Sequence, residues 1–292
     1  MVSVIKRIKK GNPYYYLKHD DGKVQREIYL GTVIPKDILQ IKREFLLQIQ
    51  RDALVPLLDE IKNEYLKYLK KTPKTIIQQN LVEFSYYFTH DTQKIEGSSL
   101  TRKETYNLLR FHITPANKPE SDMIEAQKHQ EVFMQIMESR KDISLESVLR
   151  WHHDMFSKTK PEFAGKTRDF PVFISGSKST FPNAKFLPAL LKEFFKWYDN
   201  TKGNINQVEL AALVHFRFVT IHPFGDGNGR ISRLLMNHVL HKNGYPLFNI
   251  RFDQRLAYYI SLEKAVTRHE EIYFLKWFLK KYVAANRHFS KL

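Results

Sequence analysis

The sequence predicts a predominantly α-helical fold with a β-hairpin at each of two places. Three observations support this fold class. From residue 36 onward, apolar side chains recur three and four positions apart, which is the spacing of a helix face. Alternating aromatic and β-branched runs with turn residues are confined to residues 1–34 and 170–184. The chain is 42% hydrophobic and 13% aromatic, which is enough to form a buried core.

The first 34 residues predict a small β-hairpin appendage. Aromatic and β-branched residues lie on both sides of Asp20, Asp21 and Gly22, a sequence typical of a hairpin turn, and Pro35 ends the segment. Its tyrosines and lysines suit either a docking platform or a cap on a neighbouring domain, and the sequence leaves that choice open. Residues 35–72 then predict a helical connector. Its apolar stripe consists of Ile38, Ile41, Phe45, Leu46, Leu54, Leu57, Leu58, Ile61 and Leu66.

Residues 73–292 predict the main domain, which begins where Pro73 suits the first turn of a helix. Gly97 ends the first helix, and Thr101 begins the next one with Glu104 in a capping box. Helical patterns are expected over residues 76–95, 123–138, 145–156, 187–198, 208–220, 230–241, 255–267 and 273–286.

Composition excludes several classes of protein. No cysteine is present, which excludes a disulfide framework, a thiol nucleophile and thiolate metal sites. The N-terminus is charged throughout and lacks the apolar core of a signal peptide. No stretch has the roughly 18 apolar residues that a membrane-spanning helix needs. We therefore expect a cytoplasmic protein with no membrane segment.

The formal net charge is +16, from 47 Lys and Arg against 31 Asp and Glu. The excess is dispersed along the chain rather than gathered in one arm. This dispersion favours a solvated, lysine-rich surface over a nucleic-acid interface. A basic nucleic-acid-binding regulator is kept as the non-enzymatic alternative, although no helix-turn-helix is recognisable outside the main domain.

One stretch, IHPFGDGNGR at residues 221–230, concentrates groups that helix or strand formation does not require. Its glycines lie at the start of an amphipathic helix, where free N–H groups and the positive end of the helix dipole attract phosphates. Arg230 and Arg233 lie three positions apart and share a helix face. Asp226 offers a hard oxygen ligand for Mg²⁺, and His222 stands at the entrance as a general base.

The glycine pattern differs from other phosphate-binding loops. It lacks the GK[ST] of a Walker loop, and a helix rather than a strand precedes it, unlike in a dinucleotide-binding fingerprint. A plain structural turn with an incidental histidine is the alternative. The density of complementary groups within twelve residues favours the phosphate site.

The stretch HPFGDGNGRISR at residues 222–233 resembles the HPFx[D/E]GNGRxxR signature of Fic-domain proteins, with every specified position filled. The helix ELAALVHFRFVTIHPF that leads into it, the upstream SVLRWHHDMF and the segment AGKTRDFPVFISGS are also similar to that family. The resemblance covers roughly residues 73–292. It implies a Fic-type helical bundle with a short β-hairpin flap.

The resemblance implies a protein adenylyltransferase (AMPylator). Such an enzyme transfers AMP from ATP, with Mg²⁺, to a Ser, Thr or Tyr hydroxyl of a target protein. Positioning and charge neutralisation suit an in-line attack at phosphorus. The implied roles are a general base at His222, a Mg²⁺ ligand at Asp226, a phosphate cradle at Gly227, Asn228 and Gly229, a phosphate contact at Arg230, a γ-phosphate clamp at Arg233 and a buried loop anchor at Phe224.

A second stretch, TQKIEGSSLT at residues 92–101, is by its residues a helix end followed by the next helix's cap. Taken alone, its Glu96 is an exposed terminal acid. Thr92, Glu96 and Gly97 nevertheless resemble the [S/T]xxxE[G/N] inhibitory motif of Fic proteins, here on a helix of about residues 76–97 before the core. The resemblance implies that Glu96 pairs with Arg233 and so competes with the γ-phosphate.

The residues Val172, Phe173, Ile174 and Ser175 alternate like an edge strand, which can accept a target peptide by strand addition. The resemblance places the target-positioning flap of the family here. A plain surface hairpin is the alternative.

Two tyrosines and three histidines have two interpretations each. Tyr258 and Tyr259 begin a helix and suit an adenine pocket, with core packing as an equal alternative. His152, His153 and His215 lie on apolar helical stretches, where packing or hydrogen-bonding roles are favoured over metal ligation.

Other reactions of the Fic fold remain alternatives: a de-AMPylase, a Doc-type kinase or a phosphocholine transferase. The intact Gly229-Arg230 pair disfavours the kinase branch. The target protein is unknown from the sequence, self-modification is expected, nucleic acid is not expected as a partner, and a homodimer is left open.

Overall fold

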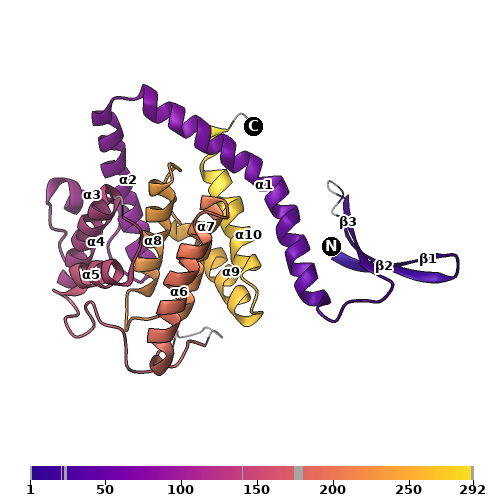
Figure 1. Ribbon diagram of the computed structural model, residues 1–292. Helices are drawn as coiled ribbons and strands as arrows, with labels where there is room; N and C mark the ends of the chain where they lie inside the picture. The colour runs from indigo at the N-terminus through magenta and orange to yellow at the C-terminus, as the bar shows by residue number, and fades with distance from the viewer. Residues whose placement is uncertain (1, 21, 23–24, 140, 174–179, 291–292) are drawn as a thin grey trace. The chain divides into compact units, whose positions relative to one another are not determined.

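The computed structural model describes residues 2–20, 22, 25–139, 141–173 and 180–290 (Figure 1). Over these residues the chain forms a small antiparallel sheet followed by a succession of α-helices, which is the predominantly α-helical fold that the sequence predicts. The chain divides into two compact units, residues 1–57 and 58–292, and the boundary falls inside helix α1 (Ile38–Lys71). Each unit is described by itself.

The N-terminal unit contains a three-stranded sheet rather than the predicted hairpin. Its strands β1 (Val2–Lys9), β2 (Asn12–Asp20) and β3 (Gln25–Gly31) pair antiparallel in chain order. The predicted turn follows Asp20 and joins β2 to β3. The missed turn joins β1 to β2 at Lys10 and Gly11, both at positive φ (48° and 79°). A lysine is not typical at a left-handed turn position, so sequence reasoning overlooked it.

One face of this sheet packs on the first part of α1. The register places Val4, Leu17 and Ile28 opposite one another across the three strands, so they share a face. Leu17 is fully buried and clusters with Phe45 and Ile49 of α1. The first part of the connector therefore contributes to the core of the N-terminal unit.

The second unit begins in the latter part of α1 and contains the helices expected from the sequence. The predicted bounds of α5 and α9 agree with the structure, and the others differ by a few residues at the ends. Along the described chain, no helix combines the length and the apolar character needed to cross a membrane. The helices are α2 (Lys74–Ile95), α3 (Arg102–Phe111), α4 (Glu120–Glu138), α5 (Leu145–Phe156), α6 (Leu187–Thr201), α7 (Gln207–Ile221), α8 (Asn228–Lys242), α9 (Arg255–Thr267) and α10 (Ile272–Ala285).

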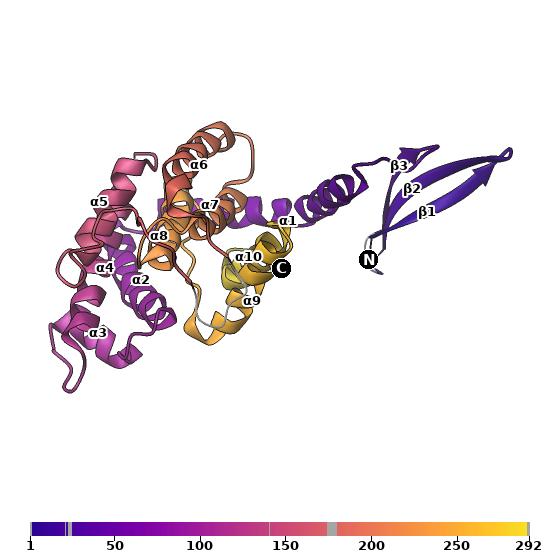
Figure 2. The same ribbon diagram turned by 90° about the horizontal axis from the view of Figure 1, so that it is seen from below.

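Helix α8 is the central helix of this unit. Both views show it flanked by α2, α4 and α5 on one side and by α7 on the other (Figures 1 and 2). Residues from Ile231 to Leu240 are buried all around the helix, as expected of a core helix. Its N-terminus lies beside the C-terminal end of α2, because Arg233 contacts both Thr92 and Glu96.

The predicted second hairpin is not observed in the described part of the segment. Residues 170–173 and 180–183 are irregular, and Ile174 and Ser175 lie outside the described residues. Pro171 and Pro182 have no N–H group to donate to a strand ladder, which accounts for the irregular backbone next to them. The strand predicted around Val172 and Ile174 stays a prediction for the residues beyond 173.

Candidate active site

The glycine-rich loop is closed by the side chain of Asn228. Helix α7 ends at His222 in the left-handed conformation (φ 52°), and α8 begins after Gly227 (φ 81°). The Asn228 carboxamide accepts from the Phe224 N–H at 2.9 Å and donates to the Phe224 carbonyl at 2.8 Å. This buried side chain pairs with both backbone groups of Phe224, as a neighbouring strand would, and so holds the loop closed.

Phe224 anchors the loop. His152 of α5 contacts both Phe224 and the loop backbone. Phe224 is buried and stacks on the His152 ring with centroids 3.7 Å apart. The Gly165 N–H donates to His152 Nδ1 at 3.0 Å, so the proton lies on Nε2, which donates to the Asp226 carbonyl at 3.0 Å. Burial lowers the pKa of His152 to about 4, so the ring stays neutral near pH 7. His152 therefore packs and hydrogen-bonds, as the sequence favoured.

Each of the loop glycines has a different neighbour. A Cβ atom at Gly225 would lie 3.0 Å from the rings of Phe163 and Phe170. One at Gly227 would overlap the Phe156 ring. Packing therefore excludes a side chain at Gly227 and leaves little room for one at Gly225.

At Gly229 the neighbour is a charged group. A Cβ atom there would overlap the carboxylate of Glu96. Gly229 lies in the first turn of α8, where N–H groups have no carbonyl one turn earlier to bond to. The anion-attracting end of α8 thus faces a carboxylate of the same chain.

His222 is oriented as a general base. Its Nδ1 lies 3.1 Å from the Val219 carbonyl, an acceptor, so Nδ1 carries the proton and Nε2 is left with its lone pair. The ring packs against Phe181 with centroids 4.0 Å apart. Burial lowers the pKa of His222 from its ordinary value, which keeps the imidazole neutral and able to accept a proton at pH 7.

Arg168 ties the predicted flap segment to the catalytic loop, and sequence reasoning missed it. Its side chain is buried and donates to three carbonyls: His222 at 2.8 Å, Phe170 at 2.8 Å and Pro182 at 2.7 Å. Its backbone N–H also donates to the Pro223 carbonyl at 2.9 Å. One guanidinium therefore joins both ends of the segment to His222, the predicted general base.

The predicted metal ligand, Asp226, is held by two cations. Its Oδ2 accepts from Lys160 at 2.7 Å and from Arg230 at 2.9 Å, and its Oδ1 accepts from the Gly227 N–H at 2.5 Å. Burial alone would raise the pKa of the Asp226 carboxyl. The two cations and the N–H outweigh it and hold that pKa well below the usual range. Asp226 is therefore a carboxylate at every physiological pH.

Arg230 binds protein groups through both of its Nη atoms. It is almost completely buried, with its guanidinium 4.4 Å above the centroid of the Phe156 ring. Besides Asp226, it donates to Gln93 of α2 at 3.1 Å and to Glu125 of α4. Glu125 also accepts from Lys160 at 2.7 Å. Sequence reasoning missed both Glu125 and Lys160, which α4 and the segment after α5 bring to the loop.

Arg233 and Glu96 form the ion pair that the inhibitory motif implies. Arg233 Nη2 donates to Glu96 Oε1 at 2.6 Å and to the Thr92 carbonyl at 3.2 Å. The Arg233 side chain is 1% exposed, and that of Glu96 is 27% exposed. Glu96 caps the C-terminus of α2, and Gly97 follows it at φ 101°. The predicted inhibitory helix thus places its carboxylate on the predicted γ-phosphate clamp.

The two tyrosines lie beside this pair in different ways. Tyr258 is buried, its hydroxyl lies 3.0 Å from His215 Nε2, and Arg233 Nη1 donates to it at 3.4 Å. Tyr259 is 44% exposed, and its hydroxyl donates to the Ile95 carbonyl at 2.9 Å. Tyr258 belongs to the core with His215, and Tyr259 fastens the end of α2. The adenine pocket stays a prediction.

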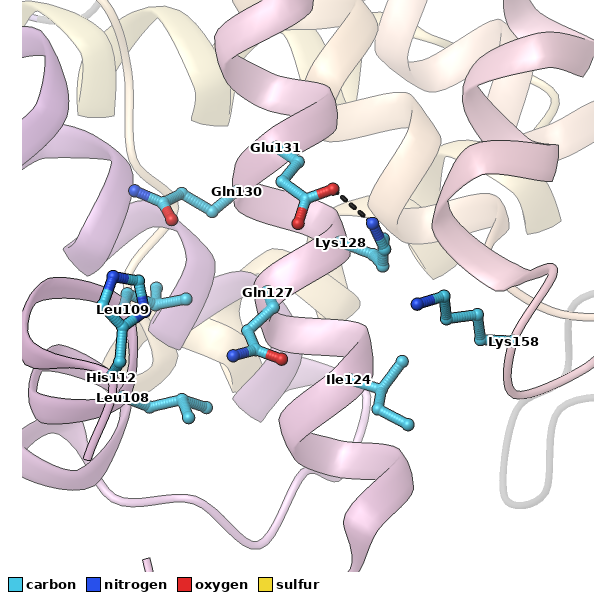
Figure 3. Close-up of a pocket in the computed structure, with 9 residues that line it drawn as sticks. All are labelled: Leu108, Leu109, His112, Ile124, Gln127, Lys128, Gln130, Glu131 and Lys158. Carbon is cyan, nitrogen blue, oxygen red and sulfur yellow. Dashed lines mark hydrogen bonds and ion pairs between the residues drawn. The ribbon is translucent and has the colours of Figure 1, made fainter. Parts of the chain in front are cut away.

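Two further groups lie apart from the loop. Of the predicted target-binding residues that the structure describes, Val172 is half-buried and Phe173 is 87% exposed. A cavity of about 410 Å³ lies between α3 and α4, with Gln127 and the paired Lys128 and Glu131 pointing toward it from α4 (Figure 3). None of the motif residues lines it.

Comparison with known proteins places these residues in a family. The sequence profile of the Fic/DOC family matches residues 142–240, which include the loop, its anchor and most of α8. The chain carries a Fic domain. Similarity to curated proteins extends beyond it. Protein adenylyltransferase Fic of Drosophila melanogaster is 30% identical over 264 residues, 86% of this chain and 52% of that protein. Protein adenylyltransferase fic-1 of Caenorhabditis elegans is 27% identical over 203 residues, 65% of this chain and 38% of that protein.

Solved structures share the fold of this Fic domain. A Fic domain containing signaling protein from Bacteroides thetaiotaomicron matches with a TM-score of 0.70 at 24% identity, over 79% of this chain and 95% of that one. Fic-1 of C. elegans, residues 134–508, matches with a TM-score of 0.73 at 21% identity, over 89% and 78%. The chain spans about half or less of the length of the curated relatives it matches.

Proposed function

We propose that this Fic domain is a protein adenylyltransferase that transfers AMP from ATP to a hydroxyl group of a target protein. The observation that carries the proposal is the placement of His222 Nε2, a neutral acceptor, at the entrance of the phosphate-attracting N-terminus of α8. The names of the curated relatives, protein adenylyltransferases, support the same reaction.

In the proposed reaction, the target hydroxyl attacks the α-phosphorus of ATP. Its proton passes to His222 Nε2, the bond between the α-phosphorus and the bridging oxygen breaks, and pyrophosphate leaves with the electron pair. The N–H groups of the first turn of α8 stabilise the charge that develops on phosphate oxygens. Arg168 holds the His222 peptide in place and thereby orients the base.

The donor set suits Mg²⁺ delivered with the nucleotide. Asp226 is ionised and 38% exposed at its side chain, so one hard carboxylate oxygen is accessible at the loop. Mg²⁺ is commonly bound by one or two carboxylates together with substrate phosphates and water. Asp226 would hold the ion, whose chemistry there is to neutralise phosphate charge. Lys160, now 2.7 Å from Asp226, would have to give way.

We also propose that Glu96 restrains the activity. Its carboxylate occupies Arg233 and covers Gly229, where the terminal phosphates would bind. Two anions cannot share one guanidinium in a buried site without strong repulsion. ATP in a reactive pose therefore requires that Glu96 first move away from Arg233.

The test uses purified full chain with ATP labelled at the α- or the γ-phosphorus, and self-labelling as the readout. We expect weak labelling of wild type from the α position, strong labelling of Glu96→Gly, and none in the Glu96→Gly, His222→Ala double variant. Label from the γ position would identify a kinase instead. Equal labelling of wild type and Glu96→Gly would reject the restraint while leaving the transfer reaction intact.

A further inference from the structure

A large groove lies at the other end of α8 from the catalytic loop. Its volume is about 1010 Å³, and it is bounded by the latter part of α1, by α2, by α10 and by the segment after α8. Aromatic rings form much of its wall. Tyr65 lies 5.1 Å from Phe289 and Tyr68 lies 5.8 Å from it, ring centre to ring centre, and Phe84 and Phe248 add two more rings.

The Lys, Arg and His residues that line the groove are all basic, and no acidic residue lines it. The basic residues are Arg251, Lys281, His241 and His288. Arg251 pairs at 2.6 Å with Asp253, which does not line the groove, so Lys281 contributes most of the positive charge there. Aromatic walls favour a flat ring, and the cations favour a negative group on the same molecule. We propose that this groove binds a planar aromatic anion, and that its occupancy strengthens the restraint of Glu96 on Arg233.

The groove and the restraint share helix α2. Ile77, Asn80, Leu81 and Phe84 line the groove at positions i, i+3, i+4 and i+7, so one continuous face of α2 forms a wall. The same helix ends at Glu96. Asn80 also donates to the Tyr68 hydroxyl at 2.8 Å, which joins α2 to the opposite wall. A ligand that contacts both walls stabilises α2 in its present position.

A second link runs through the segment after α8. Asn249 lines the groove and donates to Asp91 Oδ2 at 2.6 Å, and the Phe252 N–H donates to Asp91 Oδ1 at 3.2 Å. Asp91 immediately precedes Thr92, whose carbonyl accepts from Arg233. Because this arrangement belongs to the state in which Glu96 is paired, a ligand that fits the groove shifts the population toward that state.

Binding is tested with two dyes of matching shape. 8-Anilinonaphthalene-1-sulfonate carries a sulfonate, and N-phenyl-1-naphthylamine has the same rings without it. We expect saturable fluorescence with the sulfonate dye bound more tightly. Lys281→Glu should weaken the sulfonate dye roughly fivefold or more and spare the neutral one. Lys280→Glu, the exposed neighbour outside the groove, is the matched control and should change neither.

Filling the groove gives an independent check. Ala284 lines it and is exposed, so Ala284→Trp should fold, as its thermal melt will verify, and should abolish binding of both dyes. Retained dye binding in Ala284→Trp, or equal effects of Lys280→Glu and Lys281→Glu, would overturn the proposal. Displacement of the sulfonate dye by AMP supports a nucleotide, and displacement by indole-3-acetate supports an aromatic carboxylate. Displacement by neither overturns it.

The effect on the restraint rests on the proposed function. Saturation with the displacing compound should lower self-labelling of wild type at least twofold and leave Ala284→Trp unchanged. An unchanged or raised rate in wild type would overturn the coupling. If Glu96→Gly shows no AMP transfer at all, the proposed function fails while the dye titrations still decide the binding site.

Discussion

Removal of the Glu96 carboxylate should destabilise the protein while it activates it. Arg233 is 1% exposed, and Glu96 is its carboxylate partner at 2.6 Å. Loss of one partner from a fully buried ion pair costs about 3–5 kcal/mol. Because Glu96 is 27% exposed and water reaches it, we expect about 2 kcal/mol for Glu96→Gly. For a unit of this size that is a fall in Tm of about 4–8 °C.

The assay is thermal unfolding of wild type, Glu96→Gly and Glu96→Gln, each with and without Mg-ATP. Glu96→Gln keeps an oxygen for the guanidinium without the charge, so its loss of stability should be about half as large. ATP at 100 times its Kd contributes about 2.7 kcal/mol to a state that binds it freely. In wild type, part of this energy is used to displace Glu96, so the same ATP concentration should raise Tm less.

A matched control is Glu138→Gly, which removes an exposed glutamate from the last turn of α4, far from any arginine clamp. Its Tm should fall only slightly, because a glycine in the last turn of a helix lowers the stability of that helix a little. The rise in Tm on addition of ATP should be the same as in wild type. If Glu96→Gly melts like Glu138→Gly, or if ATP stabilises wild type and Glu96→Gly equally, then the carboxylate does not compete with the nucleotide and the reasoning fails.

Three further predictions concern the loop itself. Lys160→Met should tighten the binding of Mn²⁺ about fivefold, because Lys160 holds Asp226 at 2.7 Å. Mn²⁺ replaces Mg²⁺ here so that binding can be followed by electron paramagnetic resonance. Substitution of the exposed Lys158 by Met should not change Mn²⁺ binding. Because burial lowers the pKa of His222 and the base acts only when neutral, kcat/KM of the activated enzyme should fall with acid only below pH 6.5; an acid limb above that value would contradict the assignment. Asn228→Ala should lower the free energy of unfolding, measured in urea, by about 2–3 kcal/mol, since it leaves the N–H and the carbonyl of Phe224 unpaired. An unchanged urea midpoint would show that the loop closes without the Asn228 side chain.

The sequence predicted what local patterns encode. Helix bounds followed from apolar periodicity, and the capping box of Thr101 and Glu104 formed as expected. The loop was predictable because its groups lie within twelve consecutive residues. Glu125, Lys160 and Arg168 were not, because each comes from a different element and meets the loop only after the helices pack.

The strand predictions were less complete for a related reason. Period-two alternation over a few residues is a weak signal, and Pro171 and Pro182 interrupt it in the described parts of the flap segment. The additional strand β1 was hidden by a turn at Lys10 and Gly11, whose sequence is not typical of hairpins. Backbone conformation at such turns depends on pairing with distant residues, which a single sequence does not display.

The charges of the site support Glu96, rather than another acid, as the proposed restraint. Lys160, Arg230 and Arg233 face three carboxylates, so the site is neutralised before any nucleotide arrives, and a triphosphate can bind only where a carboxylate leaves. Glu125 and Asp226 each accept from at least three groups, whereas Glu96 holds Arg233 through one oxygen.

Glu96 also lies at a helix end rather than within the packed core. It is the C-cap of α2, and Gly97 beyond it adopts a conformation open to glycine at little cost. Displacement of the C-terminal end of α2 together with Glu96 would free Arg233 and the N-terminus of α8. The charge of Arg233 that would bind a phosphate is therefore the same charge that holds Glu96. An activating signal would have to outweigh only the ion pair between Arg233 and Glu96.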